Sequence, residues 1–143
     1  MNNIEIIYGK AHEGKTNELV ERYVNYCNGK TMIDGKEYKN SDLVKPIFIY
    51  GEETLENIKE RIKLKDTNFD FTDKMFEDGS KDISETWIKV LEEKNDLVIF
   101  LDANVNYIDV PKFIQNVMQY VFVLQSKGLG IDILFTAISP KAL

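Results

Sequence analysis

The sequence is poor in several residue types, and each shortage narrows what the chain can be. Its 143 residues include one cysteine, Cys27, which excludes an intramolecular disulfide and a zinc site built from cysteines. Arg22 and Arg61 are the only arginines, which limits bidentate recognition of phosphate or guanine and the supply of arginine fingers. No apolar run reaches the length of a membrane span, and no basic segment followed by an apolar one opens the chain. We therefore expect a cytoplasmic protein without a membrane partner.

The chain does contain enough apolar side chains for a core. Apolar residues make up 43% and aromatic residues 11% of it, which predicts one compact domain over residues 1–143. The formal net charge of −6 argues against a dedicated nucleic-acid-binding protein, because binding to phosphates needs a concentrated basic face. The net charge does not exclude a local basic patch that binds nucleic acid.

Strand-like and helix-like segments alternate along the chain. Short apolar runs favour strands at residues 4–8, 47–50, 97–101 and 131–138, with a shorter one at 75–76. Apolar residues recurring at three and four predict helices over residues 15–28, from about 55, from 83 and over 111–127. The alternation is typical of an α/β fold in three layers, with a mostly parallel sheet covered by helices on both faces.

Three local features refine this expectation. Asp34 and Gly35 lie between alternating runs and predict a tight hairpin over residues 30–39. Asp82 is expected to cap the third helix. The side chains expected to face inward from the last helix are Phe113, Ile114, Val117, Met118, Val121 and Leu124. The strand at 97–101 is expected to end at Asp102.

Residues 9–16 read G-K-A-H-E-G-K-T and match the phosphate-binding pattern G-x-x-x-x-G-K-[ST]. The segment follows an apolar strand and opens a helix, where backbone N–H groups and the helix dipole favour a phosphate. We expect Lys15 to reach the β- and γ-phosphates of ATP and the Thr16 hydroxyl to hold Mg²⁺. The alternative is a glycine-rich turn that merely starts a helix. The nucleotide-binding residues expected are Gly9, Lys10, Ala11, His12, Glu13, Gly14, Lys15, Thr16 and Asn17.

His12 and Glu13 lie inside this loop and are tempting as catalytic groups. Their spacing from any partner is uninformative, so we interpret them as solvent-facing positions in a loop whose backbone binds phosphate. Glu13 does add negative charge close to the expected phosphates.

Carboxylates follow two of the predicted strands. Asp102 comes directly after the most apolar strand, which has the form of an element that delivers a carboxylate to the Mg²⁺ shell. Glu52 and Glu53 follow the strand at 47–50, where one carboxylate could polarise the water that attacks the γ-phosphate. The alternative for this pair is that both residues simply begin the next helix.

Across nearly its whole length the chain resembles the core of the RecA-like P-loop ATPases, most closely the KaiC and DnaB branches. The resemblance rests on the loop, on I-F-I-Y-G-E-E-T-L-E-N-I, on L-V-I-F-L-D-A and on Q-S-K-G-L-G-I-D-I-L-F-T-A-I-S. It implies that Glu52 or Glu53 is the catalytic base, with Lys15 assisting and Ser139 near the γ-phosphate as a sensor. It also implies ATP and Mg²⁺ as cofactors, and self-assembly or docking onto a larger partner. The family's DNA-binding loops and trans-acting finger usually lie beyond the position of Leu143.

The first third, I-I-Y-G-K-A-H-E-G-K-T-N-E-L-V-E-R-Y, is also similar to the opening of bacterial thymidine kinases. Those enzymes carry a D-E-A-Q type sequence and a cysteine-bound zinc lasso, whereas this chain has Asp102-Ala103-Asn104-Val105 and one cysteine. Three functions therefore stay open. The expected one is a Mg²⁺-dependent ATPase, and the alternatives are a nucleoside kinase and a non-hydrolysing, nucleotide-dependent switch or adaptor.

Overall fold

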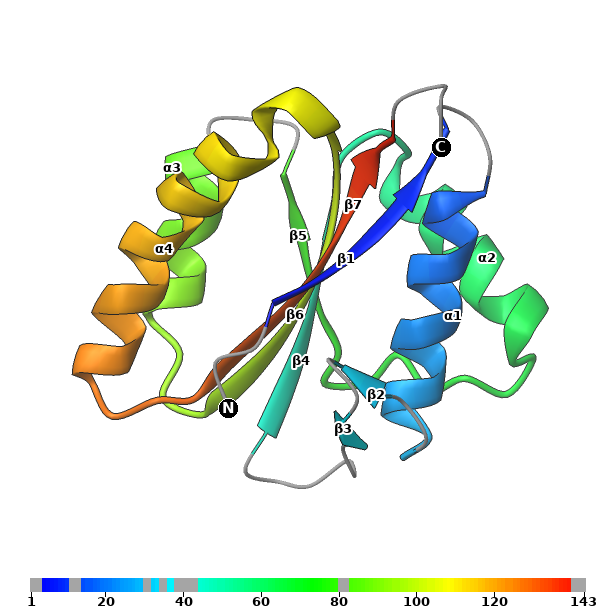
Figure 1. Ribbon diagram of the computed structural model, residues 1–143. Coiled ribbons are helices and arrows are strands. Elements are labelled where there is room, and N and C mark those ends of the chain that lie inside the picture. Colours follow the sequence, from blue (N-terminus) through cyan, green and yellow to red (C-terminus); the bar gives the residue numbers. More distant parts are fainter. Residues whose placement is uncertain are drawn as a thin grey trace.

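A sheet of five parallel strands runs through the centre of the molecule (Figure 1). The computed structural model describes residues 4–10, 14–29, 32–33, 36–37, 44–79 and 83–139. The strand order is β1-β7-β6-β4-β5. The strands are β1 (Ile4–Gly9), β4 (Val44–Tyr50), β5 (Met75–Asp78), β6 (Asp96–Asn106) and β7 (Ile131–Ile138). Because all five run the same way, their carboxyl ends meet at one edge of the sheet.

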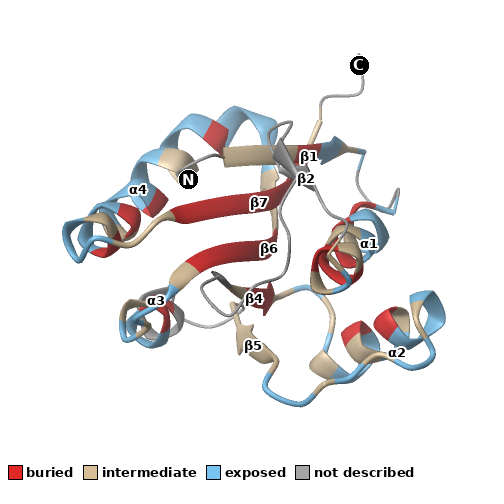
Figure 2. Cartoon of the chain, turned by 90° about the horizontal axis from the view of Figure 1, so that it is seen from below, coloured by how far each residue is buried: buried red, intermediate tan, exposed pale blue. Residues whose placement is uncertain are grey.

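Helices cover both faces of this sheet, so the predicted three-layer α/β architecture is confirmed. Helices α1 (Lys15–Cys27) and α2 (Leu55–Lys65) lie on one face, and α3 (Ile83–Leu91) and α4 (Val110–Ser126) lie on the other (Figures 1 and 2). A short 3₁₀ helix, η1 (Tyr107–Asp109), leads into α4. Of the predicted hairpin, the structure shows the antiparallel pair β2 (Met32–Ile33) and β3 (Lys36–Glu37), while Asp34 and Gly35 lie outside the described residues.

Each face of the sheet has its own apolar core, and successive side chains of a strand belong alternately to one core and to the other. In β6, Leu97 and Ile99 pack toward α3 and α4, whereas Phe100 packs toward α1 and α2. This is the period of two that a strand buried on both faces imposes. Aromatic rings dominate the α1 side, where the Tyr23 ring meets Phe48 and Phe100 edge to face, both at 5.3 Å between centroids.

Two strands are longer than expected. Strand β6 does not end at Asp102 but continues to Asn106, because its pairing with β7, interrupted by a β-bulge after Leu101, resumes at Val105. Strand β4 begins at Val44 rather than at residue 47. Pro46 lies inside it, opposite Val98 of β6 and before the first residue paired with β5, where a missing N–H is tolerated.

The expected inner face of the last helix was wrong at one position. Val117, Val121 and Leu124 are buried, but Met118 is 37% exposed. A residue adjacent to Val117 is turned about 100° away from it, which places Met118 at the border of the buried stripe. The expected cap Asp82 lies outside the described residues. Within those residues, no helix combines the length and the apolar character that crossing a membrane requires.

Candidate functional site

The loop after β1 leads into α1 through a glycine and a buried lysine. Gly14 has φ 79°, a left-handed conformation that costs other residues strain. Lys15, the first residue of α1, is only 5% exposed, and its Nζ donates to the Lys10 carbonyl at 2.7 Å. A Cβ at Gly9 would lie 2.9 Å from Lys15 Cγ, so a glycine is needed where the lysine stem crosses the end of β1. The Lys15 ammonium group is therefore held against the Lys10 carbonyl at the carboxyl edge of the sheet.

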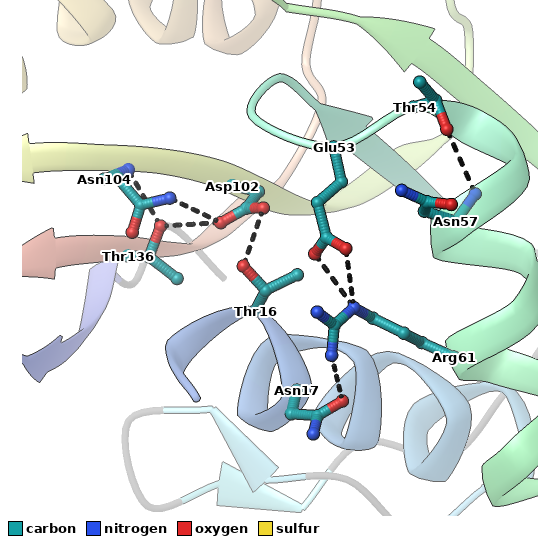
Figure 3. A network of polar contacts seen from close by, with 9 residues as sticks. All are labelled: Thr16, Asn17, Glu53, Thr54, Asn57, Arg61, Asp102, Asn104 and Thr136. Atoms are coloured by element: carbon teal, nitrogen blue, oxygen red, sulfur yellow. Dashed lines mark hydrogen bonds and ion pairs between the residues drawn. The ribbon is translucent and has the colours of Figure 1, made fainter. Parts of the chain in front are cut away.

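Asp102 is the centre of a hydrogen-bond network at the same edge (Figure 3). The Thr16 hydroxyl donates to its Oδ2 at 3.1 Å. The Thr136 hydroxyl and the Asn104 side-chain amide donate to its Oδ1 at 3.1 Å and 3.2 Å. Both carboxylate oxygens of this buried residue are thus satisfied by polar groups from α1, β6 and β7.

The β-bulge in β6 explains how Asn104 joins this network. Asn104 has φ 46°, a left-handed conformation that asparagine adopts more readily than most residues. Its N–H donates to the Thr136 hydroxyl at 2.9 Å, while its side chain turns back to Asp102. The bulge therefore aims a second polar side chain at the carboxylate, a known use of bulges beside functional sites.

Burial raises the pKa of the Asp102 carboxyl above its ordinary value, because the charged form loses water. Hydrogen bonds from Thr136 and Thr16 lower the pKa, and the negative charges of Glu52 and Glu53 raise it. The net shift is upward, so a cation beside Asp102 would offset the cost of keeping this carboxylate charged.

Replacement of Asp102 by asparagine is expected to stabilise the free protein at neutral pH. The folded protein takes up the Asp102 proton more readily than the unfolded chain does, so the charged form lowers the free energy of unfolding above the raised pKa. That penalty disappears as the pH falls below the ordinary value of 3.8. Asp102→Asn should therefore exceed the wild type in free energy of unfolding at pH 7 and converge with it in acid, as measured by urea unfolding.

Asp109→Asn is the matched control, because this carboxyl is exposed and the change should stay within about 0.5 kcal/mol at every pH. A less stable Asp102→Asn at neutral pH would mean that the hydrogen bonds to the carboxylate outweigh its burial.

The two glutamates after β4 have different surroundings. Arg61 Nε lies 2.9 Å and 2.8 Å from the two carboxylate oxygens of Glu53, and Arg61 also donates from a terminal nitrogen to Asn17 Oδ1 at 2.8 Å (Figure 3). This contact ties α2 to the start of α1. Glu52 is exposed, and none of the ion pairs between described residues involves it.

Glu52 and Glu53 do not begin the next helix, which was the alternative explanation for the pair. Helix α2 starts at Leu55, and its N-cap is Thr54, whose hydroxyl accepts the Asn57 N–H at 3.2 Å. The two glutamates precede this cap. Their acidic character is therefore not explained by a place in the first helical turn.

These groups meet around one polar cavity of about 320 Å³. Its size falls at the lower end of the range found for small-molecule sites. The residues that line it are Gly14, Lys15, Thr16, Asn17, Glu52, Glu53, Arg61 and Asn104. The loop, the glutamate pair and the Asp102 strand, which are far apart in sequence, thus contribute to one site.

Some predicted site residues lie elsewhere. Ala11, His12 and Glu13 are outside the described residues. The Ser139 N–H donates to the Gly9 carbonyl at 2.9 Å, and the residue is not among those that line the polar cavity, so its role as a sensor stays a prediction.

Sequence reasoning missed Asn104 and Thr136, and it noted Arg61 only for its rarity. Thr136 is one of two polar residues in the apolar run at 131–138, together with Asp132, and that was the available signal.

The residues present fit Mg²⁺ held together with a phosphate rather than by protein groups alone. No group of three or more His, Cys, Asp or Glu side chains in the described part of the chain is arranged to hold a metal ion. Thr16 and Asp102 offer two oxygen ligands 3.1 Å apart. Mg²⁺ usually takes one or two carboxylates and completes its shell with water and substrate phosphates.

Comparison with known proteins assigns no family to this arrangement. No family model matches the chain, and no curated protein or solved structure shows significant similarity to it. The chain is thus characterised by its α/β architecture and by the polar site at the carboxyl edge of its five-stranded parallel sheet.

Proposed function

We propose that this chain is a RecA-like P-loop ATPase that binds ATP with Mg²⁺ and hydrolyses the γ-phosphate. The observation that carries the proposal is the hydrogen bond from the Thr16 hydroxyl to Asp102, two residues 86 positions apart in sequence. A glycine-rich turn that only started a helix would not need to meet the carboxylate of the most apolar strand. A phosphate-binding loop that shares a cation with that carboxylate would.

Lys15 is the group that would neutralise the β- and γ-phosphates. Its ammonium already lies against the loop backbone, at Lys10, and it lines the polar cavity beside Thr16. An ammonium has three donors, so a phosphate oxygen can be bound without losing the contact to the carbonyl.

Thr16 and Asp102 are the residues that would hold Mg²⁺. When bound, the cation neutralises charge that develops on the phosphate oxygens. Thr136 and Asn104 keep the Asp102 carboxylate oriented toward Thr16 by donating to the opposite oxygen. These two residues are positioning residues in the proposal.

Glu52 is the proposed base that orients and activates the attacking water. It lines the polar cavity, it is exposed, and its carboxylate is not held in an ion pair among the described residues. Glu53 is held by Arg61 through both oxygens, which favours a positioning role for that residue. In this proposal Glu52 is the base, and Glu53 is a positioning residue whose ion pair with Arg61 joins the loop after β4 to α2.

Lys15→Ala is expected to weaken ATP binding by roughly 100-fold, since about 1.5 kcal/mol is lost for each of two charged hydrogen bonds. Calorimetric titration of purified protein with Mg-ATP measures this loss. Lys112→Ala, an exposed lysine at the start of α4, is the matched control and should leave the affinity unchanged. Unchanged affinity in Lys15→Ala would contradict the proposed phosphate site.

Release of ADP from Mg-ATP, with and without nucleosides or single-stranded DNA, tests the reaction itself. Formation of inorganic phosphate, the product of transfer to water, supports the ATPase. Transfer of the γ-phosphoryl group to thymidine supports the nucleoside kinase. Tight binding without turnover supports the nucleotide-dependent switch or adaptor. Solution mass with and without Mg-ATP tests the proposed self-assembly, and docking onto a larger partner is the alternative in that measurement.

A further inference from the structure

A second cavity lies beside the polar one and differs from it in chemistry. Its volume is about 260 Å³, and its walls are mostly apolar and aromatic, including Tyr50, Trp87, Phe113 and Ala103. Among the residues that the structure describes, Glu52 and Asp102 are the two charged ones that line it. Glu52 lines both cavities, so the two meet at the proposed base.

The aromatic walls are fixed by rings packed behind them. Trp87 is 1% exposed and stacks on Tyr120 of α4, with 5.0 Å between centroids and 7° between planes. Phe113 packs against Phe135 of β7 at 5.0 Å. Movement of Trp87 into the space would break its stacking on Tyr120, and movement of Phe113 would break its tilted contact with Phe135. The cavity is therefore a preformed, flat-walled space, as small-molecule sites usually are.

Size and charge restrict what could fill this space. A cavity of about 150 Å³ lined by apolar side chains accepts benzene, so the larger volume here suits one ring with a short substituent. Both oxygens of Asp102 already accept hydrogen bonds from Thr16, Thr136 and Asn104. Glu52 is left as the charged acceptor for a ligand donor, and an anionic ligand would face two carboxylates.

We propose that this cavity binds a small molecule built on one flat apolar ring, with a hydroxyl or amine donor directed at Glu52. The site goes beyond the proposed hydrolysis and does not require it. Its position gives it access to the same reaction, because a donor bound to Glu52 lies at the junction with the polar cavity.

Three ligands with the same ring and chain length but different charge test the proposal: phenethylamine, 2-phenylethanol and phenylacetate. Trp87 is the only tryptophan, so its emission reports directly on this cavity. Phenethylamine and 2-phenylethanol are expected to change the emission saturably, and phenylacetate is expected to bind at least about tenfold more weakly than the amine. No saturable change with the first two, or equal affinity for phenylacetate, would overturn the proposal.

Two variants locate the bound ring and its donor. Ala103→Leu fills the cavity and should lower the affinity for 2-phenylethanol about tenfold or more, whereas Ile88→Leu, on the exposed side of α3, should not. Glu52→Gln alters only an exposed side chain and should remove the preference for phenethylamine over 2-phenylethanol. A preference that survives Glu52→Gln would contradict the assigned donor contact.

Lys15→Ala separates this proposal from the proposed nucleotide site. The variant should keep its affinity for phenethylamine in the absence of ATP, even where ATP binding is lost. Binding that is lost in Lys15→Ala but kept in Ala103→Leu would place the ligand in the polar cavity and overturn the proposal. If the protein does not hydrolyse ATP, the titration followed by Trp87 emission still tests ligand binding in this cavity.

Discussion

Glu52→Gln is expected to lower ATP turnover by about 10²–10⁴-fold, the usual contribution of a general base, while ATP affinity changes little. Glutamine keeps the size of the side chain but cannot accept a proton from water. Glu52 is not expected to contact the phosphates, so its loss removes an interaction made in the transition state. Single-turnover measurements with Mg-ATP separate the chemical step from binding and from product release.

Glu53→Gln is the matched control, because it changes the neighbouring carboxylate in the same way. Its expected effect on turnover is smaller, since the Glu53 carboxylate is bound through both oxygens by Arg61. Arg61→Gln should reproduce the Glu53→Gln phenotype, because the two residues act as one pair. A larger loss in Glu53→Gln than in Glu52→Gln would reverse the two roles, and turnover that survives both changes would remove the base from this pair.

Phe100→Ala is expected to lower the free energy of unfolding by about 3–5 kcal/mol, the cost of deleting a large ring from a closed core. The Phe100 ring is fully buried in β6 and contacts Tyr23 and Tyr26 at 5.3 Å and 5.8 Å between centroids. Domains of this size are stable by only about 5–15 kcal/mol, so the variant should unfold at much lower denaturant concentration.

Phe122→Ala makes the same chemical change on the outer side of α4, where the ring is 71% exposed. Its effect should stay within about 0.5 kcal/mol. Urea unfolding followed by circular dichroism gives both values. Equal losses in the two variants would mean that Phe122 is covered in solution, which would point to self-association through α4.

The layered architecture could be predicted because its signals are local. The apolar runs at 97–101 and 131–138 are too short for buried helices and are flanked by turn residues, so they indicate strands. The bulge after Leu101 could not be predicted, because it depends on how β6 pairs with β7. The start of β4 at Val44 was missed as well, and only the strand order shows that Pro46 lies before the first residue paired with β5.

The residues of the candidate site could be predicted only where they belong to a local sequence motif. Lys15 and Thr16 follow from the loop pattern, and Asp102 follows from its place after an apolar strand. Arg61 and Thr136 carry no such signal. Their partners Asn17 and Asp102 lie 44 and 34 positions away, so only the packing of α2 on α1 and of β7 beside β6 brings them together. Long-range pairs of this kind need the strand and helix arrangement before they can be recognised.

The pairing of β1 with β7 also has a consequence for how the protein folds. Ile4 lies opposite Ile133 and Gly9 opposite Ile138, so the strand that carries the loop is held by nearly the last residues of the sheet. Closing so long a chain segment is entropically costly, and parallel pairings of this range form slowly. During synthesis, β6 and β4 can pair well before β7 has emerged, while β1 must wait for it. The proposed phosphate-binding loop should therefore be among the last parts of this domain to become ordered, and a nascent chain should acquire the proposed nucleotide affinity only when β7 is in place.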